Sequence, residues 1–417
     1  MKFNKWTLGL AAVGVVSLTS AARADETPKM SQMQTALSST TISGYVDVSA
    51  QFTPQSGGTP AGGTAPNNSP NYYYGNSPNS INLNVVDIAI DHPQDESPWA
   101  TGYHVEFFVG PVAQAMVLNN DIRQAYIMLR TPVGNGIDWK IGIFDTIVGY
   151  ESTTTANNPN YSHSYGYNME PTTHTGILGN YKATDWLSVQ FGVADTSYSG
   201  AGAYNAANTT GAPNSQLYHP TFMWGPTLTA PDSFGWAKGA TLSVATIITG
   251  GNASGDAPVG SSPYHGAGAK TIYAGVTLPT PIAALTTGAS VDYLTASDAS
   301  ANEWDAALYA SWKFNDKLSL NLRGEYMEAK PLDAAGAYGV TNPLGLPVGP
   351  NGVIPPYPGN DAQELTATLQ YALWANVLTR LGLRWDHSNS TSYGYTTNAG
   401  SNQQNAFMLA AQAVYQF

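Results

Sequence analysis

The chain has 417 residues, of which 11% are charged, and it has a formal net charge of -12 and no cysteine. Globular proteins carry about 25% charged residues, so this composition disfavours a water-exposed globular enzyme, and the negative charge disfavours a nucleic-acid-binding protein. Without cysteine, the chain has neither disulfides nor zinc-thiolate sites. The mean hydropathy of -0.19 also disfavours an apolar helix bundle, and it is typical of a β-barrel with an apolar outer band and a polar lumen.

The first residues have the pattern of a bacterial secretory signal. Two lysines are followed by an apolar stretch over residues 8–18 and by the small-x-small sequence Ala22-Arg23-Ala24. This order is typical of a signal peptide, and the apolar stretch is shorter than the roughly 18 residues that a spanning helix needs. We therefore expect a signal peptide over 1–24, a periplasmic segment over 25–40, and an exported chain that folds from residue 41 to residue 417.

Apolar and polar residues alternate along most of the remaining chain. In the segment 303–314, Trp304 and Trp312 share one parity, whereas Asp305 and Lys313 share the other. Successive side chains of a strand point to opposite faces, so this two-residue period predicts β-strands. Sixteen segments of this kind are each about long enough to cross a membrane as a tilted strand. They lie at 41–53, 80–91, 101–111, 120–131, 137–148, 172–183, 186–197, 217–229, 239–250, 268–279, 284–296, 303–314, 317–329, 362–374, 377–388 and 405–417.

The connections between these segments alternate between short turns and long loops rich in Gly, Pro and Asn, the longest being the proline-rich segment 330–361. Outer-membrane barrels have short periplasmic turns and long external loops. The sequence therefore predicts an all-β protein, a transmembrane antiparallel up-and-down β-barrel of sixteen strands. In such a barrel the last strand pairs with the first, and both termini lie in the periplasm. The alternation slips at Val85-Val86, which indicates a β-bulge.

Several short motifs in residues 121–182 resemble those of one family. They are Asp121-Ile122-Arg123-Gln124-Ala125-Tyr126, Pro132-Val133-Gly134-Asn135-Gly136, Gly142-Ile143-Phe144, Gly149-Tyr150-Glu151, Asn160-Tyr161-Ser162 and His174-Thr175-Gly176. Together with Gly44-Tyr45-Val46-Asp47 in the first strand, they resemble the OmpL-like β-barrel porins, the family called β-barrel porin 2.

This resemblance implies a porin in the outer membrane of a Gram-negative bacterium, with a water-filled channel for passive diffusion of small hydrophilic solutes and ions. Well-known sixteen-stranded porins are trimers, so a homotrimer in contact with outer-membrane lipids is expected. In outer-membrane proteins generally, a terminal aromatic residue is read by the barrel-assembly machinery, which implies that role for Phe417. No cofactor and no metal ion are implied.

The connection 149–171 is the third external loop by this count. In the well-known porins the third loop folds into the lumen and narrows it, and a polar lumen can satisfy the backbone of such a loop. The resemblance thus implies a constriction formed by this loop. The alternative is a surface loop folded over the mouth of the barrel. The candidate constriction residues are Tyr150, Glu151, Tyr161, His163 and Glu170.

Charged residues with inward parity are the candidates for the pore wall. They are Lys140, Lys182, Asp305, Lys313, Arg323, Glu325, Arg380 and Arg384. A lumen lined by both signs of charge would orient dipolar solutes and select ions. The alternative is that these residues form salt bridges within the wall. Arg123 shares the parity of apolar residues, and this predicts an outward side chain near the strand end.

Other functions remain as alternatives. One is a structural or adhesive outer-membrane barrel with a plugged lumen and partner-binding loops, and another is a secreted soluble β-sandwich or β-solenoid. An enzyme is disfavoured, because the sequence has no Gly-x-Ser-x-Gly elbow, phosphate-binding loop or dinucleotide fingerprint.

Overall fold

The computed structural model describes residues 33–34, 40–53, 79–115, 121–194, 220–250, 270–295, 302–330, 360–388, 395–396 and 402–417. The expected signal peptide, most of the 25–40 segment and nearly all of the 330–361 loop lie outside these residues. In the described part of the chain, no helix is long and apolar enough to cross a membrane.

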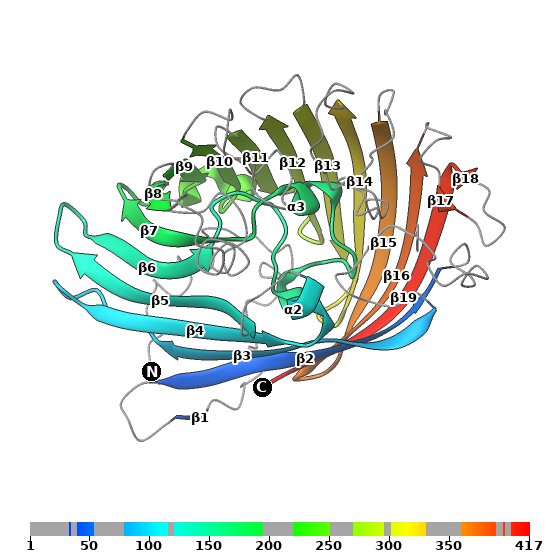
Figure 1. The fold of residues 1–417 in the computed structure, drawn as a ribbon, viewed down its shortest axis with the longest axis horizontal. Helices are drawn as coiled ribbons and strands as arrows, with labels where there is room; N and C mark the ends of the chain where they lie inside the picture. Colours follow the sequence, from blue (N-terminus) through cyan, green and yellow to red (C-terminus); the bar gives the residue numbers. More distant parts are fainter. Residues whose placement is uncertain are drawn as a thin grey trace, which may run out of the picture.

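Sixteen antiparallel strands form a closed barrel (Figure 1), which confirms the predicted fold. The two-residue strand β1 (Met33–Gln34) pairs with the first barrel strand, and a two-stranded sheet of β17 (Tyr395–Thr396) and β18 (Asn402–Gln403) lies outside the barrel sheet. The barrel strands are β2 (Thr41–Phe52), β3 (Ser80–His92), β4 (Thr101–Val109), β5 (Ile122–Thr131), β6 (Ile137–Asp145), β7 (Thr173–Lys182), β8 (Leu187–Ala194), β9 (Thr221–Thr229), β10 (Thr241–Thr249), β11 (Lys270–Pro279), β12 (Leu285–Thr295), β13 (Asn302–Lys313), β14 (Leu318–Lys330), β15 (Asn360–Trp374), β16 (Val377–Ser388) and β19 (Asn405–Gln416).

The barrel closes between its last and first strands, as predicted. Strand β19 pairs with β2 in the register Val414↔Asp47, and Gly44 exchanges two backbone hydrogen bonds with Phe417, of 3.2 and 3.0 Å. No strand edge is then left unpaired in the ring, and this is a requirement of a sheet in lipid.

Side chains alternate between the two faces of the wall. In β9, Phe222 and Trp224 are exposed on the outside, whereas Met223 and Gly225 are buried on the inside. The same alternation in the other strands gives the barrel an apolar outer surface, which lipid solvates, and an inner surface of polar and small residues.

Two β-bulges change which residues face inward. The first places Asn84 between Leu83 and Val85, which pair with successive residues of β2. It accounts for the phase slip that the sequence shows at this point, and it turns Asn84 inward, where its side-chain amide donates to Asp47.

The second bulge corrects the prediction for Arg123. In the β4–β5 register Glu106 pairs with Gln124 and Phe107 with Ile122, so Arg123 is the extra residue. A bulge places two residues opposite one, and both Arg123 and Gln124 are therefore buried inside. The Arg123 side chain pairs with Glu106 at 2.8 Å and with Asp145 at 2.5 Å.

The connection between β6 and β7 lies inside the ring of strands (Figure 1). It contains the short helices η3 (Thr155–Asn157) and α3 (Tyr165–Met169), and a third short helix, α2 (Pro111–Ala115), follows β4. Among the connections expected on the periplasmic side, β3–β4 (residues 93–100) and β9–β10 (residues 230–240) are the longest, and the second holds η5 (Asp232–Ala237). The barrel thus encloses a folded segment of its own chain.

Candidate functional site at the contact between the inner loop and the wall

The inner loop, residues 146–172, is almost entirely buried. The side chain of Ser164 caps α3 by accepting a hydrogen bond from the Tyr167 amide, and the Asn158 side chain accepts from the Ser152 amide at 2.8 Å. The loop contains only short helices and no strand, so these side chains satisfy backbone amides that regular secondary structure leaves without an acceptor. The loop therefore keeps a defined shape in the lumen.

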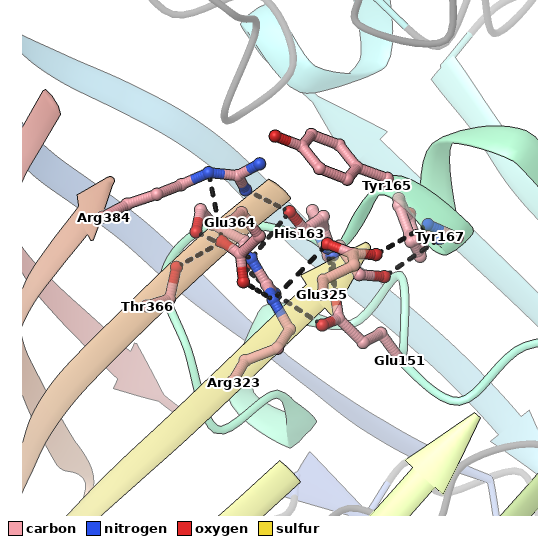
Figure 2. Close-up of polar contacts among 12 residues, drawn as sticks. Glu151, His163, Tyr165, Tyr167, Arg323, Glu325, Glu364, Thr366 and Arg384 are labelled. Carbon is pink, nitrogen blue, oxygen red and sulfur yellow. Dashed lines mark hydrogen bonds and ion pairs between the residues drawn. The ribbon is translucent and has the colours of Figure 1, made fainter. Parts of the chain in front are cut away.

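Arg323 of β14 joins this loop to the wall (Figure 2). Its guanidinium pairs with Glu364 of β15 at 2.8 Å and with Glu151 of the loop at 2.6 Å. It also donates to the carbonyl oxygens of Ser162 and His163, at 2.8 and 3.0 Å. The Arg323 side chain is fully buried, and these contacts satisfy the donors of its planar fork.

Glu151 is the loop's main acceptor in this contact. Besides Arg323, it accepts from the Ser164 amide at 3.0 Å and contacts His163 Nδ1 at 3.1 Å. Burial by itself would raise the pKa of Glu151, but the charge of Arg323 and the bonds from His163 and Ser164 outweigh it and lower the pKa to about 2. The Glu151 carboxylate is therefore ionised at neutral pH.

Two further arginines, both of β16, also bind the loop. Arg384 pairs with Asp386 at 2.7 Å and with Glu364 at 3.2 Å, and it donates to the His163 carbonyl at 2.5 Å. Arg380 donates to the carbonyl oxygens of Thr155, at 3.2 Å, and Asn158. Both arginines are almost completely buried. These two candidate pore-wall arginines are thus bonded to the loop.

Acidic residues gather on the other side of α3. Glu325 accepts from the Gly166 amide at 3.0 Å, and a Cβ on Gly166 would lie 2.8 Å from an Asp305 oxygen and 3.0 Å from an Asp292 oxygen. Glu170 of the loop faces Asp292, and burial first, then the charge of Asp292, raise the pKa of Glu170 well above its usual range. Among the described residues, no group of three or more acidic or histidine side chains is arranged to hold a metal ion.

The tyrosines of the loop contact three other parts of the wall. The Tyr150 ring stacks on Tyr309 of β13 with 4.2 Å between ring centroids, and its hydroxyl lies 3.0 Å from the Thr277 hydroxyl of β11. The Tyr161 hydroxyl lies 3.0 Å from the Ser49 hydroxyl of β2. Within the loop, His163 stacks on Tyr167. All five candidate constriction residues therefore belong to the buried loop and its contacts.

Three candidate wall residues lie apart from this contact. Lys182 and Lys313 pair with Asp185 and Asp316 of adjacent turns, each at 2.9 Å, at the ends of their strands. Lys140 of β6 places its ammonium 4.7 Å from the centre of the Tyr126 ring.

A second ionic cluster lies on the inner face of β3 to β6. His104 contacts Asp91 at 2.5 Å and Glu106 at 3.3 Å, and Arg123 joins Glu106 to Asp145. The carboxylates of Asp91 and Asp145 are about one-third exposed, at 33% and 38%. This part of the wall presents charge to the interior of the barrel.

Sequence reasoning missed several residues of the loop contact, above all Glu364, Asp386 and Asp292. Each has inward parity in its strand, and Asp386 is two residues from Arg384. Their inward parity could have identified them as partners of the arginines, because a buried arginine needs a nearby carboxylate or a set of carbonyl acceptors.

A family model described as beta-barrel porin-2, OmpL-like, matches residues 39–417. The chain belongs to this family. The match spans the whole barrel and confirms the resemblance that the motifs in residues 121–182 indicated. No curated protein sequence matches this porin.

Solved structures of outer-membrane proteins have the same fold. The anion-selective porin of Comamonas acidovorans has a TM-score of 0.57 at 10% identity, with 91% of this chain and 99% of that chain covered. The outer membrane channel DcaP of Acinetobacter baumannii has a TM-score of 0.53 at 11% identity, with 91% and 97% covered. The trimer form of OmpT of Vibrio cholerae has a TM-score of 0.50 at 14% identity, with 91% and 99% covered. These structures share the fold of this chain, and the family match over residues 39–417 makes it a porin of the Gram-negative outer membrane.

Proposed function

We propose that this porin forms a water-filled channel through which small hydrophilic solutes and ions diffuse passively, with the inner loop as its constriction. No chemical step and no cofactor are part of this proposal. The observation that carries it is the fixed position of the loop, which Arg323, Arg380 and Arg384 hold against β14 to β16.

Small hollows remain on other parts of the wall. Two of them, each of about 20 Å³, are lined by residues of β5 to β11 together with the start of the loop and Gln94. The channel that we propose passes beside the loop, away from the ion pairs that join the loop to β14, β15 and β16.

We also propose that the protein assembles as a homotrimer in outer-membrane lipids. Support comes from the trimer form of OmpT, whose fold this porin shares. The expected role of Phe417 in recognition by the barrel-assembly machinery stays a prediction.

The test is conductance across a planar lipid bilayer. Purified protein should give discrete, long-lived conductance steps in KCl, and cross-linked trimers should give steps in groups of three. Correctly folded barrels that insert without conductance would contradict the channel and favour the alternative, a structural or adhesive barrel with a plugged lumen.

A further inference from the structure

Five charged residues of β3 to β6 form a continuous row of contacts along the wall. Asp145 pairs with Arg123 at 2.5 Å, and Arg123 pairs with Glu106 at 2.8 Å. His104 contacts Glu106 at 3.3 Å and Asp91 at 2.5 Å. Asp145 is the last residue of β6, and Asp91 is the last but one of β3. In the predicted orientation these two positions are at the external and periplasmic ends, so this row, the charged track, extends from one end of the wall to the other.

The two ends of the charged track are its most accessible parts. The carboxylates of Asp91 and Asp145 are 33% and 38% exposed. By contrast, the side chains of Glu106 and Arg123, between them, are almost completely buried. An ion that moves along this wall therefore meets a carboxylate at each end, and the guanidinium of the charged track is covered.

The other arginines of the barrel are covered as well. Each arginine in the described part of the chain is no more than 7% exposed. Arg323, Arg380 and Arg384 are bonded to the inner loop, and Arg130 is paired with Asp138 at 2.6 Å. The strongest cations of the wall are thus buried and bonded, whereas two of its carboxylates are open to the lumen.

Three lysines have inward parity in the described strands, and they do not reverse this balance. Lys182 and Lys313 lie at strand ends, where the aspartates of the adjacent turns pair with them and are far more exposed than they are. Lys140 lies in β6, beside the charged track. Including Lys140, the inward charged groups of β3 to β6 are five carboxylates and three arginine or lysine side chains. This sector is therefore negative whether or not His104 is protonated.

The neighbouring strands add no charge that competes with the charged track. Strands β8, β9 and β10 contain no charged residue. The inward charges of β14 to β16 are buried in their contacts with the inner loop and with one another. Strand β6, at one edge of the track, lies across the ring from β14 (Figure 1). In a channel that passes beside the loop, the charged track is then the main source of the electric field.

We propose that Asp91 and Asp145 make this channel selective for small cations over anions. Carboxylates on a pore wall attract cations and repel anions, and the surrounding wall of low dielectric constant strengthens their field in the lumen. Arg123 and His104 fix the positions of the two carboxylates without presenting an exposed guanidinium to the solute. This inference rests on the proposed channel function and names the class of ion that the channel prefers.

The direct test replaces both carboxylates by their neutral isosteres, in the double variant Asp91→Asn with Asp145→Asn. Asparagine keeps an oxygen that can accept hydrogen bonds from His104 and Arg123. Arg123 also keeps its ion pair with Glu106, so no buried charge is left without a partner. The variant should therefore show the heat-modifiable migration of a folded barrel. Asp91→Glu with Asp145→Glu is a second variant, which keeps both charges.

The matched control removes two carboxylates from the outer face of the wall. Glu328 of β14 pairs in register with Asp361 of β15. Their parities are those of the exposed residues Leu322 and Leu365. Glu328→Gln with Asp361→Asn therefore changes the net charge as much as the double variant does, but outside the lumen.

The measurement is the reversal potential in a planar bilayer that separates two KCl concentrations. The unchanged protein should be selective for K⁺ over Cl⁻. In water a single carboxylate enriches a cation about fivefold at a distance of about 4 Å, so the permeability ratio of K⁺ to Cl⁻ should fall about fivefold or more in the double variant. The Asp→Glu variant and the control should keep the ratio. Salt screens exposed charges, so the ratio of the unchanged protein should also fall between about 0.1 M and about 1 M KCl.

The other outcomes separate this inference from the channel itself. Conducting channels that prefer Cl⁻, or that prefer neither ion, would overturn the cation selectivity and leave the channel function intact. A double variant with an unchanged ratio, or a control with an equal fall, would overturn the role of the two carboxylates. If the double variant does not fold, Asp91→Asn and Asp145→Asn are measured singly, and each should lower the ratio. A folded barrel without conductance would remove the channel function and the inference together.

Discussion

Replacement of Arg323 by methionine should release the inner loop without unfolding the barrel. Met is similar in length and apolar, so it keeps the packing while it removes the guanidinium. The loop then loses the bonds of Arg323 to Glu151, Ser162 and His163, of 2.6, 2.8 and 3.0 Å. The backbone hydrogen bonds of the strands are unaffected.

The free-energy cost of this substitution follows from the carboxylates that lose their partner. Glu151 and Glu364 are both buried, and Arg323 is bonded to each of them. Removal of one partner from a buried ion pair costs about 3–5 kcal/mol. Because about 1.4 kcal/mol is a tenfold change in an equilibrium constant, the ratio of docked to released loop should fall by roughly two to four orders of magnitude.

Limited proteolysis and single-channel recording measure this change. In the variant, a protease should cut within 149–171 in folded barrels, and the current should flicker. Arg323→Lys should have a smaller effect, because it keeps the charge but loses the planar fork. Lys182→Met, at an exposed turn pair, is the control. If Arg323→Met were as resistant to protease and as steady in current as the unchanged protein, Arg323 would not hold the loop.

Three further predictions follow from other contacts. Burial and Asp292 raise the pKa of Glu170, so the neutral form of Glu170 favours the docked loop. This stabilisation of the docked loop is complete below the ordinary pKa of 4.5 and is lost as the pH rises through the raised pKa. Proteolysis of the loop should therefore increase with pH, and an equal increase in Glu170→Gln would contradict this. Gly288→Val should displace the Tyr150 hydroxyl, cost about 1–3 kcal/mol from overpacking, and alter the unit conductance in bilayers; an unchanged conductance would count against the position of Tyr150. A Cβ on Gly44 would overlap the backbone carbonyl of Asp87 in β3 and crowd the Phe417 ring. Gly44→Val should therefore disturb the pairing of β2 with its neighbours and lower the yield of heat-modifiable barrel; normal assembly would show that β2 tolerates a larger side chain here.

The strands could be predicted from the sequence because the two faces of the wall meet different solvents. Lipid outside and polar groups inside impose a two-residue period, and the ends of β2, β14 and β16 lie within one or two residues of the predicted ends. The same period identified the inward parity of Arg323 and Arg384.

The partners of these arginines could not be predicted in the same way. Parity says which face a side chain takes, but the contact of Arg323 with Glu151 also depends on the path of the loop across the lumen. A bulge changes parity itself, because one extra residue reverses the phase of everything beyond it. Arg123 was assigned to the wrong face for this reason.

The wall residues that bind the inner loop lie far from it in the sequence, and this has a consequence for the order of folding steps. Glu151 and Arg323 are 172 residues apart in sequence, and Tyr165 and its acceptor Asp386 are 221 apart. Contacts with such long separations form late, because the intervening chain must be organised first. The last strands of the barrel must therefore be in place before the loop can settle, and a nascent barrel passes through a stage in which its lumen is wider than in the finished protein.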